Sequence, residues 1–380
     1  MVGIVSYGAY VPLRRLGKGT QGWRLPNEKA VAYYDEDSLT MAVAAAIDCL
    51  RDSDRQTVDG YYFASTTAPY KEKLTATTAA VAVDLRKDIM TADVVDSLRS
   101  GTGALRMAID TVKAGSAKKM LVTASDCRMG EPGSALDQAI GDGAAAFMIG
   151  DTDVLATLEA SYSVSNDLFD YWRGDTAKFI HQWEDRWVQE AGYMKVVPPV
   201  VKAFLEKFKL SLSDISKVAL YGNNQRRHGQ VAKMIGIKPE QMVDPLYMTV
   251  GNTGTAAVPM QLVTALESAK PGETILCIAY GDGVDILLFK TTDNVTKFKP
   301  KRGMKTHLAA KMIFPSLQGS FGFRHQGRDA ESGGGPAASV LAREVEDIYA
   351  LKGTKCKVCG TVQYPPQRVC TKCQAKDQME

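Results

Sequence analysis

The sequence predicts an α/β protein in which helices cover the sheets, followed by a small C-terminal metal-binding module. Three observations support this prediction. Short β-rich runs alternate with helical stretches from the N-terminus to about residue 290. Each half of that region ends in two extended runs around a glycine-rich turn, GDGA at 141–144 and GDGV at 281–284, which suggests an internal duplication of two similar halves. Two CxxC pairs stand close together near the C-terminus.

The first half alternates strands and helices. The stretch 103–114 carries apolar residues at i, i+3, i+4 and i+7, the spacing of one helix face, and the runs KMLVTA and AAFMI are typical of buried strands. In chain order, we expect a strand at 3–11, a helix at 38–50, a strand at 60–65, a helix at 79–85, an extended run at 89–95, a helix at 103–114 and strands at 119–124 and 144–149.

The second half repeats the alternation after about residue 195. In chain order, we expect a helix at 200–208, a strand at 217–221, a helix at 230–235, a turn at 250–254, a helix at 255–269 and extended runs at 273–279 and 284–290. The next segment opens with basic residues between 297 and 305 and carries ESGGGP at 331–336, a composition typical of a mobile linker. The predicted domains are an N-terminal half with an inter-half insertion at 1–194, a C-terminal half at 195–293, a linker at 294–350 and a zinc ribbon at 351–380.

Composition excludes several classes of protein. The 380 residues are 45% hydrophobic, enough for a full-sized core, and 46 Lys and Arg against 43 Asp and Glu leave a net charge of +3. That charge density is too low for a nucleic-acid coat or a membrane-surface protein, and no apolar run is long enough for a membrane helix. We therefore expect a cytoplasmic protein with neither nucleic acid nor membrane as partner. A nucleic-acid binder that uses the basic stretch 297–305 is disfavoured, because Phe298 is its one aromatic residue.

The C-terminal cysteines predict a structural zinc site. Cys356, Cys359, Cys370 and Cys373 form two CxxC pairs, and Zn²⁺ prefers four such thiolates in a tetrahedron. So short a segment has too little apolar core to fold alone, so metal binding must supply most of its folding free energy. A redox role is the alternative, disfavoured because two pairs occur together. Four cysteine ligands leave no open coordination position, so this zinc is not expected to be catalytic.

Several longer strings carry a family resemblance. They are GIVSYGAYVP at 3–12, STTAPYKEKLTATT at 65–78, ASDCRMGEPGSALDQAIGDGAAAFMIG at 124–150, DYWR at 170–173, VGNTGTAAVPMQL at 250–262 and AYGDGVD at 279–285. Together they resemble the thiolase superfamily, and within it the archaeal and bacterial 3-hydroxy-3-methylglutaryl-CoA synthase branch, near the ketoacyl synthase III enzymes. The resemblance implies a thiolase-like five-layered αβαβα body, a homodimeric core and a CoA thioester as ligand.

The cysteine-rich end resembles the zinc-ribbon part of small acyl-CoA-associated proteins in which an OB-fold follows the ribbon. Those proteins accompany thiolases in complexes. The resemblance implies two further partners for this chain: a thiolase-like catalytic subunit, and an OB-fold supplied by a following domain or another subunit.

The resembled synthases use a cysteine nucleophile, a histidine, an asparagine and a glutamate. The flanking strings locate these positions in the chain. Leu98 stands at the cysteine position, Thr66 at the glutamate position and Gly222 at the histidine position. The asparagine is retained as Asn252. Leucine cannot form an acyl-enzyme. We therefore expect a subunit that keeps the fold and lacks its own acyl transfer, serving as a scaffold or docking partner.

An active acyltransferase with a non-standard nucleophile is the alternative. Ser97 or Ser100 would attack the thioester, and a base such as His228 would have to reach them. The simpler interpretation of both serines is helix N-capping.

Further residues have candidate roles. Asn252 either holds an oxyanion or a loop turn, and both interpretations stay open. Arg226 and Arg227 are candidate CoA contacts. His181, in the inter-half insertion, is expected to be a surface histidine. Three further cysteines are expected to be structural: Cys49, Cys127 and Cys277.

Overall fold

The computed structural model describes residues 1–51, 53–168, 170–222, 224–320, 339, 343, 347 and 350–380. Nine strands form its main sheet: β1 (Gly3–Tyr10), β4 (Gly60–Ser65), β5 (Met90–Val95), β6 (Met120–Asp126), β7 (Gly143–Gly150), β8 (Ala156–Ser165), β11 (Lys217–Leu220), β12 (Thr274–Tyr280) and β13 (Gly283–Thr291). Their order is β11-β12-β13-β8-β1-β7-β6-β4-β5. β1 and β8 pair at only two positions, Gly3 with Thr157 and Ile4 with Ala156, so the sheet divides there into two halves.

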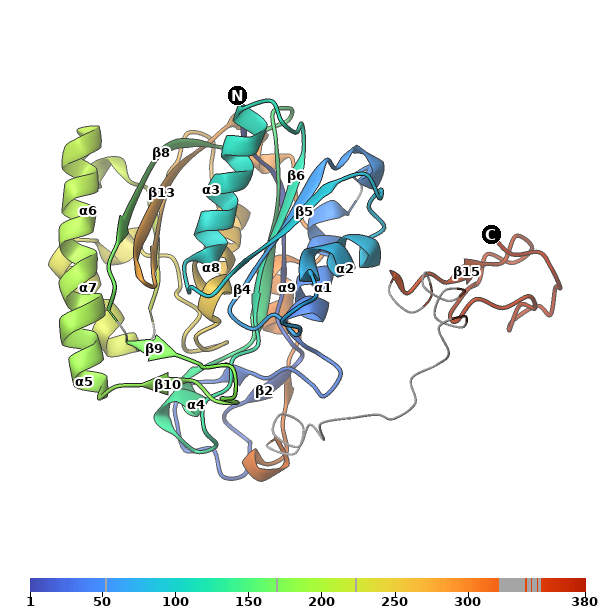
Figure 1. The fold of residues 1–380 in the computed structure, drawn as a ribbon, viewed down its shortest axis with the longest axis horizontal. Helices are drawn as coiled ribbons and strands as arrows, with labels where there is room; N and C mark the ends of the chain where they lie inside the picture. Colours follow the sequence, from blue (N-terminus) through green and yellow to red (C-terminus); the bar gives the residue numbers. More distant parts are fainter. Residues whose placement is uncertain are drawn as a thin grey trace.

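Helices form three layers around the two half-sheets. The main helices are α1 (Ser38–Leu50), α2 (Thr75–Ala82), α3 (Ser100–Lys113), α6 (Met194–Phe208), α7 (Gln225–Ile235) and α8 (Ala257–Glu267). Figure 1 shows α3 and α8 between the two half-sheets, α1 and α2 outside one of them, and α6 and α7 outside the other. This is the five-layered αβαβα arrangement, so the predicted fold class is confirmed.

The central layer explains the apolar spacing of its helices. In α3 the residues that recur at helical spacing, Leu105, Ala108, Ile109 and Val112, are buried. In α8 nearly every residue is buried, because this helix has a half-sheet on each side. The main apolar cluster extends through this layer and joins both halves.

Several elements of the body differ from the prediction, among them α7, which begins at Gln225 and not at about residue 230. α2 begins at Thr75 and ends at Ala82, before the predicted 79–85. α6 begins at Met194, before the predicted residue 200, because it continues directly from a π-helical turn at Val188–Tyr193. It contains Pro198 and Pro199, and the burial of its valines against the sheet offsets the cost of prolines inside a helix. β8 was not predicted from the sequence, because only two of its ten residues are buried and its sequence has no continuous apolar run.

The predicted linker at 294–350 is wrong for its first part. Residues 294–320 fold onto the body and include α9 (Gly303–Ala309) and β14 (Met312–Ile313), which pairs with β2 (Arg14–Leu16); β2 also pairs with β3 (Lys29–Ala30). Two carboxylates hold the start of α9: Asp48 accepts the Gly303 N–H at 2.9 Å, and Glu267 accepts the Met304 N–H at 2.6 Å. Apart from 339, 343, 347 and 350, the rest of the predicted linker lies outside the described residues, as does ESGGGP.

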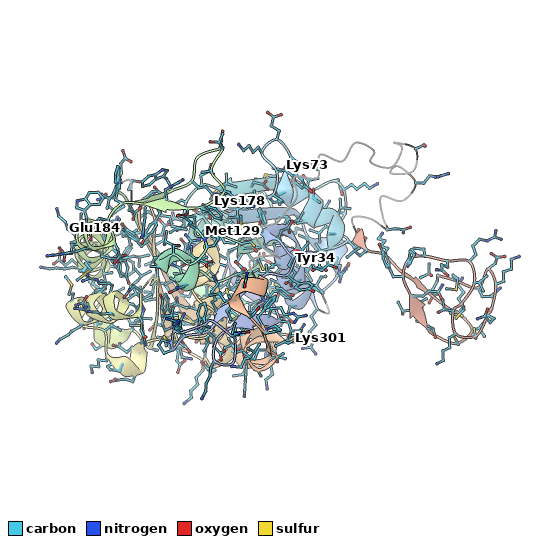
Figure 2. The ribbon with its side chains drawn as sticks, turned by 90° about the horizontal axis from the view of Figure 1, so that it is seen from below. Tyr34, Lys73, Met129, Lys178, Glu184 and Lys301 are labelled. Atoms are coloured by element: carbon cyan, nitrogen blue, oxygen red, sulfur yellow. The ribbon has the colours of Figure 1, made fainter. Side chains whose placement is uncertain are left out.

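The inter-half insertion lies at one end of the body. It contains β9 (Tyr171–Trp172), β10 (His181–Gln182) and the short helix α5 (Asp185–Trp187), and it runs beside α4 (Ala135–Ala139). The Ile180 N–H donates to the Met129 carbonyl at 2.9 Å, and Figure 2 shows Met129 next to Lys178 at this end. The C-terminal ribbon, with β15 (Thr354–Lys355) and β16 (Val362–Gln363), lies outside these layers.

Candidate functional site

The predicted site positions lie where several strands end. Thr66 directly follows β4, Gly222 lies just beyond β11, and Leu98 stands two residues before α3. Asn252 lies in the loop that leads to α8. The Thr255 hydroxyl donates to the Ser97 carbonyl at 3.2 Å, so the loop before α3 touches the turn that carries Asn252.

Asp126, at the end of β6, ties the Thr66 loop to the turn after Asn252. Its fully buried carboxylate accepts the Thr66 N–H at 2.7 Å and the Thr66 hydroxyl at 2.9 Å. It also accepts the Thr255 N–H at 2.7 Å. The resemblance places a glutamate at position 66. The residue there is Thr66, which donates two hydrogen bonds to the Asp126 carboxylate.

The predicted nucleophile position holds Leu98, a side chain without a nucleophilic atom. Leu98 is partly buried and packs against the main apolar cluster. Ser97 and Ser100 lie beside it, but their hydroxyls donate to backbone carbonyls, of Gly281 at 3.3 Å and Val95 at 3.2 Å. Neither serine caps α3, whose N-cap residue is Arg99, so the N-cap interpretation is wrong. Among the described residues, neither serine hydrogen-bonds to a histidine.

The first turn of α7 brings His228 back onto Gly222. A Cβ atom at Gly222 would lie 2.7 Å from Cδ2 of His228, so the imidazole occupies the space that a side chain at 222 would need. Burial lowers the pKa of His228, which hydrogen-bonds to the Leu220 backbone. His228 therefore packs beside the former histidine position and does not line the cavity that Asn252 lines.

A cavity of about 230 Å³ lies next to Asn252. The lining residues come from α4, the loop around Arg128, the inter-half insertion, the start of α7 and the Asn252 turn. They are Leu25, Arg128, Ala135, Leu136, Gln138, Ala139, Ile140, Tyr171, Gln182, Asp185, Gln189, Tyr221, Asn224, Tyr247 and Asn252. A buried ion pair anchors α4 there, since the Lys29 ammonium lies 3.1 Å from the Asp137 carboxylate.

Three buried polar side chains form a connected group in the cavity wall. Arg128 donates to Oδ1 of Asn252 at 3.1 Å, and Nδ2 of Asn252 donates to the Tyr221 hydroxyl at 3.0 Å. Burial raises the pKa of Tyr221, while the positive charge of Arg128 acts in the opposite direction. Gly254, with φ of +58°, passes between Arg128 and Asp126, where a Cβ atom would lie 2.3 Å from the Asp126 carboxylate.

The sequence analysis found Asn252 but missed Arg128, Tyr221 and Asp126. Asp126 and Arg128 stand in the string ASDCRMG at the end of a strand, where charged residues that directly follow a buried run are a usable signal. Tyr221 had no signal of its own, because an aromatic residue at a strand end is ordinary in a core.

The structure separates the other candidates from the cavity wall. Arg226 is exposed, and Arg227 donates to the Gln230 side chain at 3.3 Å; both follow Asn224, which caps α7 and lines the cavity. Their role toward CoA stays a prediction. His181 is exposed and stacks on Trp172, with ring centroids 5.8 Å apart.

The four C-terminal cysteines come together as predicted. Their sulfur atoms all lie within 4.8 Å of one another, with Cys356 to Cys373 at 3.6 Å and Cys359 to Cys370 at 3.5 Å. A tetrahedral Zn²⁺ with Zn–S bonds of about 2.3 Å requires sulfur separations of about 3.8 Å. The donor set therefore fits a zinc ion. Of the remaining cysteines, Cys49 and Cys277 are buried and Cys127 is partly buried.

No helix in the described part of the chain combines the length and the apolar character that crossing a membrane requires.

Two family models match this chain. The model for the C-terminal part of 3-oxoacyl-[acyl-carrier-protein] synthase III matches residues 205–287, and the model for the ChsH2 rubredoxin-like zinc ribbon domain matches residues 343–380. Among solved structures, an HMG-CoA synthase complexed with CoA superposes with a TM-score of 0.76 at 18% identity, covering 84% of this chain and 89% of that one. The 3-oxoacyl-[acyl-carrier-protein] synthase III of Aquifex aeolicus superposes with a TM-score of 0.65 at 21% identity, covering 76% of this chain and all of that one.

Curated relatives are more similar in sequence. The hydroxymethylglutaryl-CoA synthase of Methanocaldococcus jannaschii is 33% identical over 318 residues, which cover 79% of this chain and 92% of the relative. That of Archaeoglobus fulgidus is 30% identical over 315 residues, covering 78% and 91%. With this identity over nearly the whole relative, the chain belongs to the hydroxymethylglutaryl-CoA synthase family of the thiolase superfamily, and it carries a zinc-ribbon domain at its C-terminus.

Proposed function

We propose that this protein is a synthase-like subunit of an acyl-CoA complex that forms or cleaves C–C bonds, and that it binds a CoA thioester without forming an acyl-enzyme of its own. The observation that carries the proposal is Leu98 at the nucleophile position. A leucine side chain has no atom that attacks a thioester, and both neighbouring serines donate to backbone carbonyls. Thr66 and Gly222 at the other two positions support the same conclusion.

The body still has the features that a binding subunit needs. The cavity persists next to Asn252, and a similar structure is that of an HMG-CoA synthase complexed with CoA. We propose that the thioester enters this cavity, with Arg226 and Arg227 near the CoA moiety and Asn252 toward the thioester. A homodimeric core is part of the proposal.

The ribbon gives the proposed complex its second contact. We propose that Cys356, Cys359, Cys370 and Cys373 bind a structural Zn²⁺, and that residues 351–380 connect the body to an OB-fold domain or subunit and to a thiolase-like catalytic subunit. In this arrangement, the scaffold positions the acyl-CoA while the partner supplies the nucleophile.

Intact-mass measurement after incubation with acetyl-CoA tests this proposal. We expect no added acetyl group on the wild-type chain, and an acetylated thiolase-like partner when the complex is purified from the native host. The variant L98C is the matched control, because it places a thiol before α3, where the N-terminal end of the helix stabilises a thiolate. Acetylation of the wild-type chain itself would instead establish the alternative, an active acyltransferase that uses Ser97 or Ser100.

A further inference from the structure

The inter-half insertion opens with the string DYWR at 170–173, which contacts both halves of the body. The hydroxyl of Tyr280, the last residue of β12 in the second half, donates to Oδ2 of Asp170 at 2.8 Å. The Arg173 guanidinium donates to the carbonyl of Thr66, which follows β4 in the first half, at 2.9 Å. The hydrogen bond from Tyr280 is buried and the one from Arg173 is exposed, so water competes with the second and not with the first.

Both carboxylate oxygens of Asp170 accept hydrogen bonds. Oδ1 accepts the N–H of Tyr171 at 2.8 Å, and Oδ2 accepts the Tyr280 hydroxyl. Asp170 is 6% exposed, and burial raises the pKa of its carboxyl group. Burial, followed by the charge of Asp170, raises the pKa of Tyr280, so this hydroxyl keeps its proton and is the donor. Asp170 thus fixes the backbone directly before Tyr171, which lines the cavity.

The far end of the insertion meets the same tyrosine. A Cβ atom at Gly192 would lie 2.4 Å from the Tyr280 hydroxyl oxygen and 2.7 Å from Cδ2 of Leu168, so any side chain at 192 would displace that hydroxyl. Gly192 stands in the π-helical turn Val188–Tyr193, which also carries Gln189 of the cavity wall. Tyr280 therefore contacts both the beginning and the end of the insertion, and each end carries a residue that lines the cavity.

Tyr280 itself is fixed by the core. It is 3% exposed and packs edge-on against Tyr193, with ring centroids 5.5 Å apart. Tyr193 packs in the same way against Tyr221, with centroids 6.2 Å apart, and Tyr221 accepts a hydrogen bond from Asn252. Packed rings thus connect the ends of the insertion with the Asn252 side of the cavity. Because close-packed rings have little freedom to move, the Tyr280 hydroxyl is a fixed point to which the insertion is attached.

We propose that Asp170 and Tyr280 are positioning residues for the cavity. Neither side chain lines it, but their hydrogen bond holds the insertion against the body, so that Tyr171, Gln182 and Gln189 form one wall. Without this bond the wall is free to move, and a ligand has to order it on binding, which lowers the affinity. The ligand part of this inference rests on the proposed function, whereas the position of the wall can be measured without any ligand.

Hydrogen exchange of the backbone amides at 171–190 measures the wall in the full chain purified with zinc. We expect this segment to exchange about tenfold faster in Tyr280→Phe, because one buried hydrogen bond is lost. Three of the four tryptophans lie in the same segment, Trp172, Trp183 and Trp187, so quenching of their fluorescence by acrylamide should increase as well. Unchanged exchange and quenching in this variant would overturn the proposal.

Substitutions of Asp170 separate its hydrogen bonds from its packing. Asp170→Asn keeps both contacts, because the amide oxygen accepts the Tyr171 N–H and the NH₂ group donates to the Tyr280 oxygen. It should stay within about twofold of the wild type in exchange rate. Asp170→Leu is similar in size and has no acceptor, so its insertion should exchange at least as fast as that of Tyr280→Phe. If Asp170→Asn behaves like Asp170→Leu, the hydrogen bond does not hold the insertion, and the assignment is wrong.

Asp175→Asn is the matched control, because it changes a second aspartate of the same insertion. Asp175 pairs with Lys71 at 3.2 Å, and the two side chains are 90% and 68% exposed, so exchange and quenching should not change. An effect as large as that of Tyr280→Phe would show that loss of any such contact loosens the insertion, which contradicts the assignment. Should Asp170→Leu fail to fold, as judged by thermal unfolding, Tyr280→Phe and Asp170→Asn decide.

Calorimetric titration with acetyl-CoA connects the wall to ligand binding. We expect the Kd for acetyl-CoA to rise about 5- to 10-fold in Tyr280→Phe and to stay within about twofold of the wild type in Asp175→Asn. If Tyr280→Phe loosens the insertion and the Kd does not change, the wall does not position the ligand, and the proposal fails. If the insertion loosens but the wild type binds no acetyl-CoA, the proposed function fails, and the role of Asp170 and Tyr280 in holding the wall stands.

Discussion

The body and the zinc ribbon relate fold to chemistry in opposite ways. In the body, the positions predicted to be reactive hold Leu98, Thr66 and Gly222, and the sheet with all its layers is in place. In the ribbon, β15 and β16 are two residues long, and Val362 and Tyr364 are more than half exposed. The four thiols are the centre of the ribbon, whereas the reactive groups of the body lie at loop ends beside a core that forms without them.

Physical reasons explain this difference. The body buries a large apolar cluster that joins α3, α8 and both half-sheets, and burial of such area supplies most of the folding free energy. Of the residues at the predicted reactive positions, Leu98 is partly buried and packs against this cluster, and Thr66 and Gly222 are not among its members. The ribbon has no comparable cluster in the described residues, so the metal-binding atoms are also the folding atoms. We therefore expect the fold of the body to be independent of the side chains at those predicted positions, and the fold of the ribbon to depend on its four cysteines.

Removal of zinc should have the largest effect. We expect Cys370→Ser, or a strong chelator, to unfold residues 351–380, with an apparent loss on the order of 10 kcal/mol for the ribbon and no change in the unfolding midpoint of the body. Metal content and limited proteolysis report on the ribbon, and calorimetry reports on the body. If the ribbon stays resistant to protease after the metal is chelated, its fold does not depend on zinc, and the difference from the body is contradicted.

A core substitution in the body should destabilise the body and leave the ribbon unchanged. Phe204 is fully buried in α6 and packs against Phe208, with ring centroids 5.0 Å apart. Phe204→Ala should cost about 3 to 5 kcal/mol in urea unfolding of the body and leave the zinc content unchanged. The exposed Lys202→Ala on the same helix is the control, with a change expected within about 0.5 kcal/mol. A loss of zinc from the Phe204 variant would show that the two domains are coupled.

One contribution to the stability of the body depends on pH. His307, in α9, is buried, and desolvation followed by the charge of Arg302 lowers its pKa to about 4. The unfolded chain, with a histidine pKa of about 6.5, binds more protons between these values, so this contribution is complete above about pH 6.5 and is lost as the pH falls toward 4. The loss amounts to at most about 3 kcal/mol.

The pH profile of His307→Gln isolates this group from other titrating residues. Unfolding free energies of the wild type and the variant, measured by urea titration from pH 4.5 to 7.5, should converge as the pH falls. Parallel profiles would mean that His307 is accessible to protons in the folded body.

Substitution of Leu98, at the predicted nucleophile position, should have the smallest effect. Leu98 is only partly buried, so Leu98→Cys should change the unfolding free energy by about 1 kcal/mol or less. The matched control is Leu105→Cys in α3, a leucine that is 1% exposed, for which we expect about 2 kcal/mol or more. Equal costs at the two positions would show that Leu98 has become part of the core.

Local pattern made much of the fold predictable. The helical spacing at 103–114 and the apolar runs at 119–124 and 144–149 lead directly to α3, β6 and β7. β8 and the start of α6 were not predicted, because their conformation depends on their packing partners. β8 pairs with β1 and β13. α6 contains two prolines, and its valines are buried in the body. The basic composition of residues 294–320 predicts a linker. It gives no sign of the hydrogen bonds from the start of α9 to Asp48 and Glu267, because backbone N–H groups donate them.

The sequence by itself determined the α/β alternation and the cysteine ligand set, because each is a property of residues close together in the chain. It also predicted substituted catalytic positions at Leu98, Thr66 and Gly222, and these stay predictions. Only the tertiary structure decided that Arg128, Tyr221 and Asn252 meet in one cavity wall, and that His228 occupies the space beside Gly222. Arg128 follows β6, Tyr221 follows β11 and Asn252 lies in the loop before α8, so the three residues belong to separate parts of the chain. Hydrogen bonds between such residues exist only once the sheet and its crossover helices have brought those ends together.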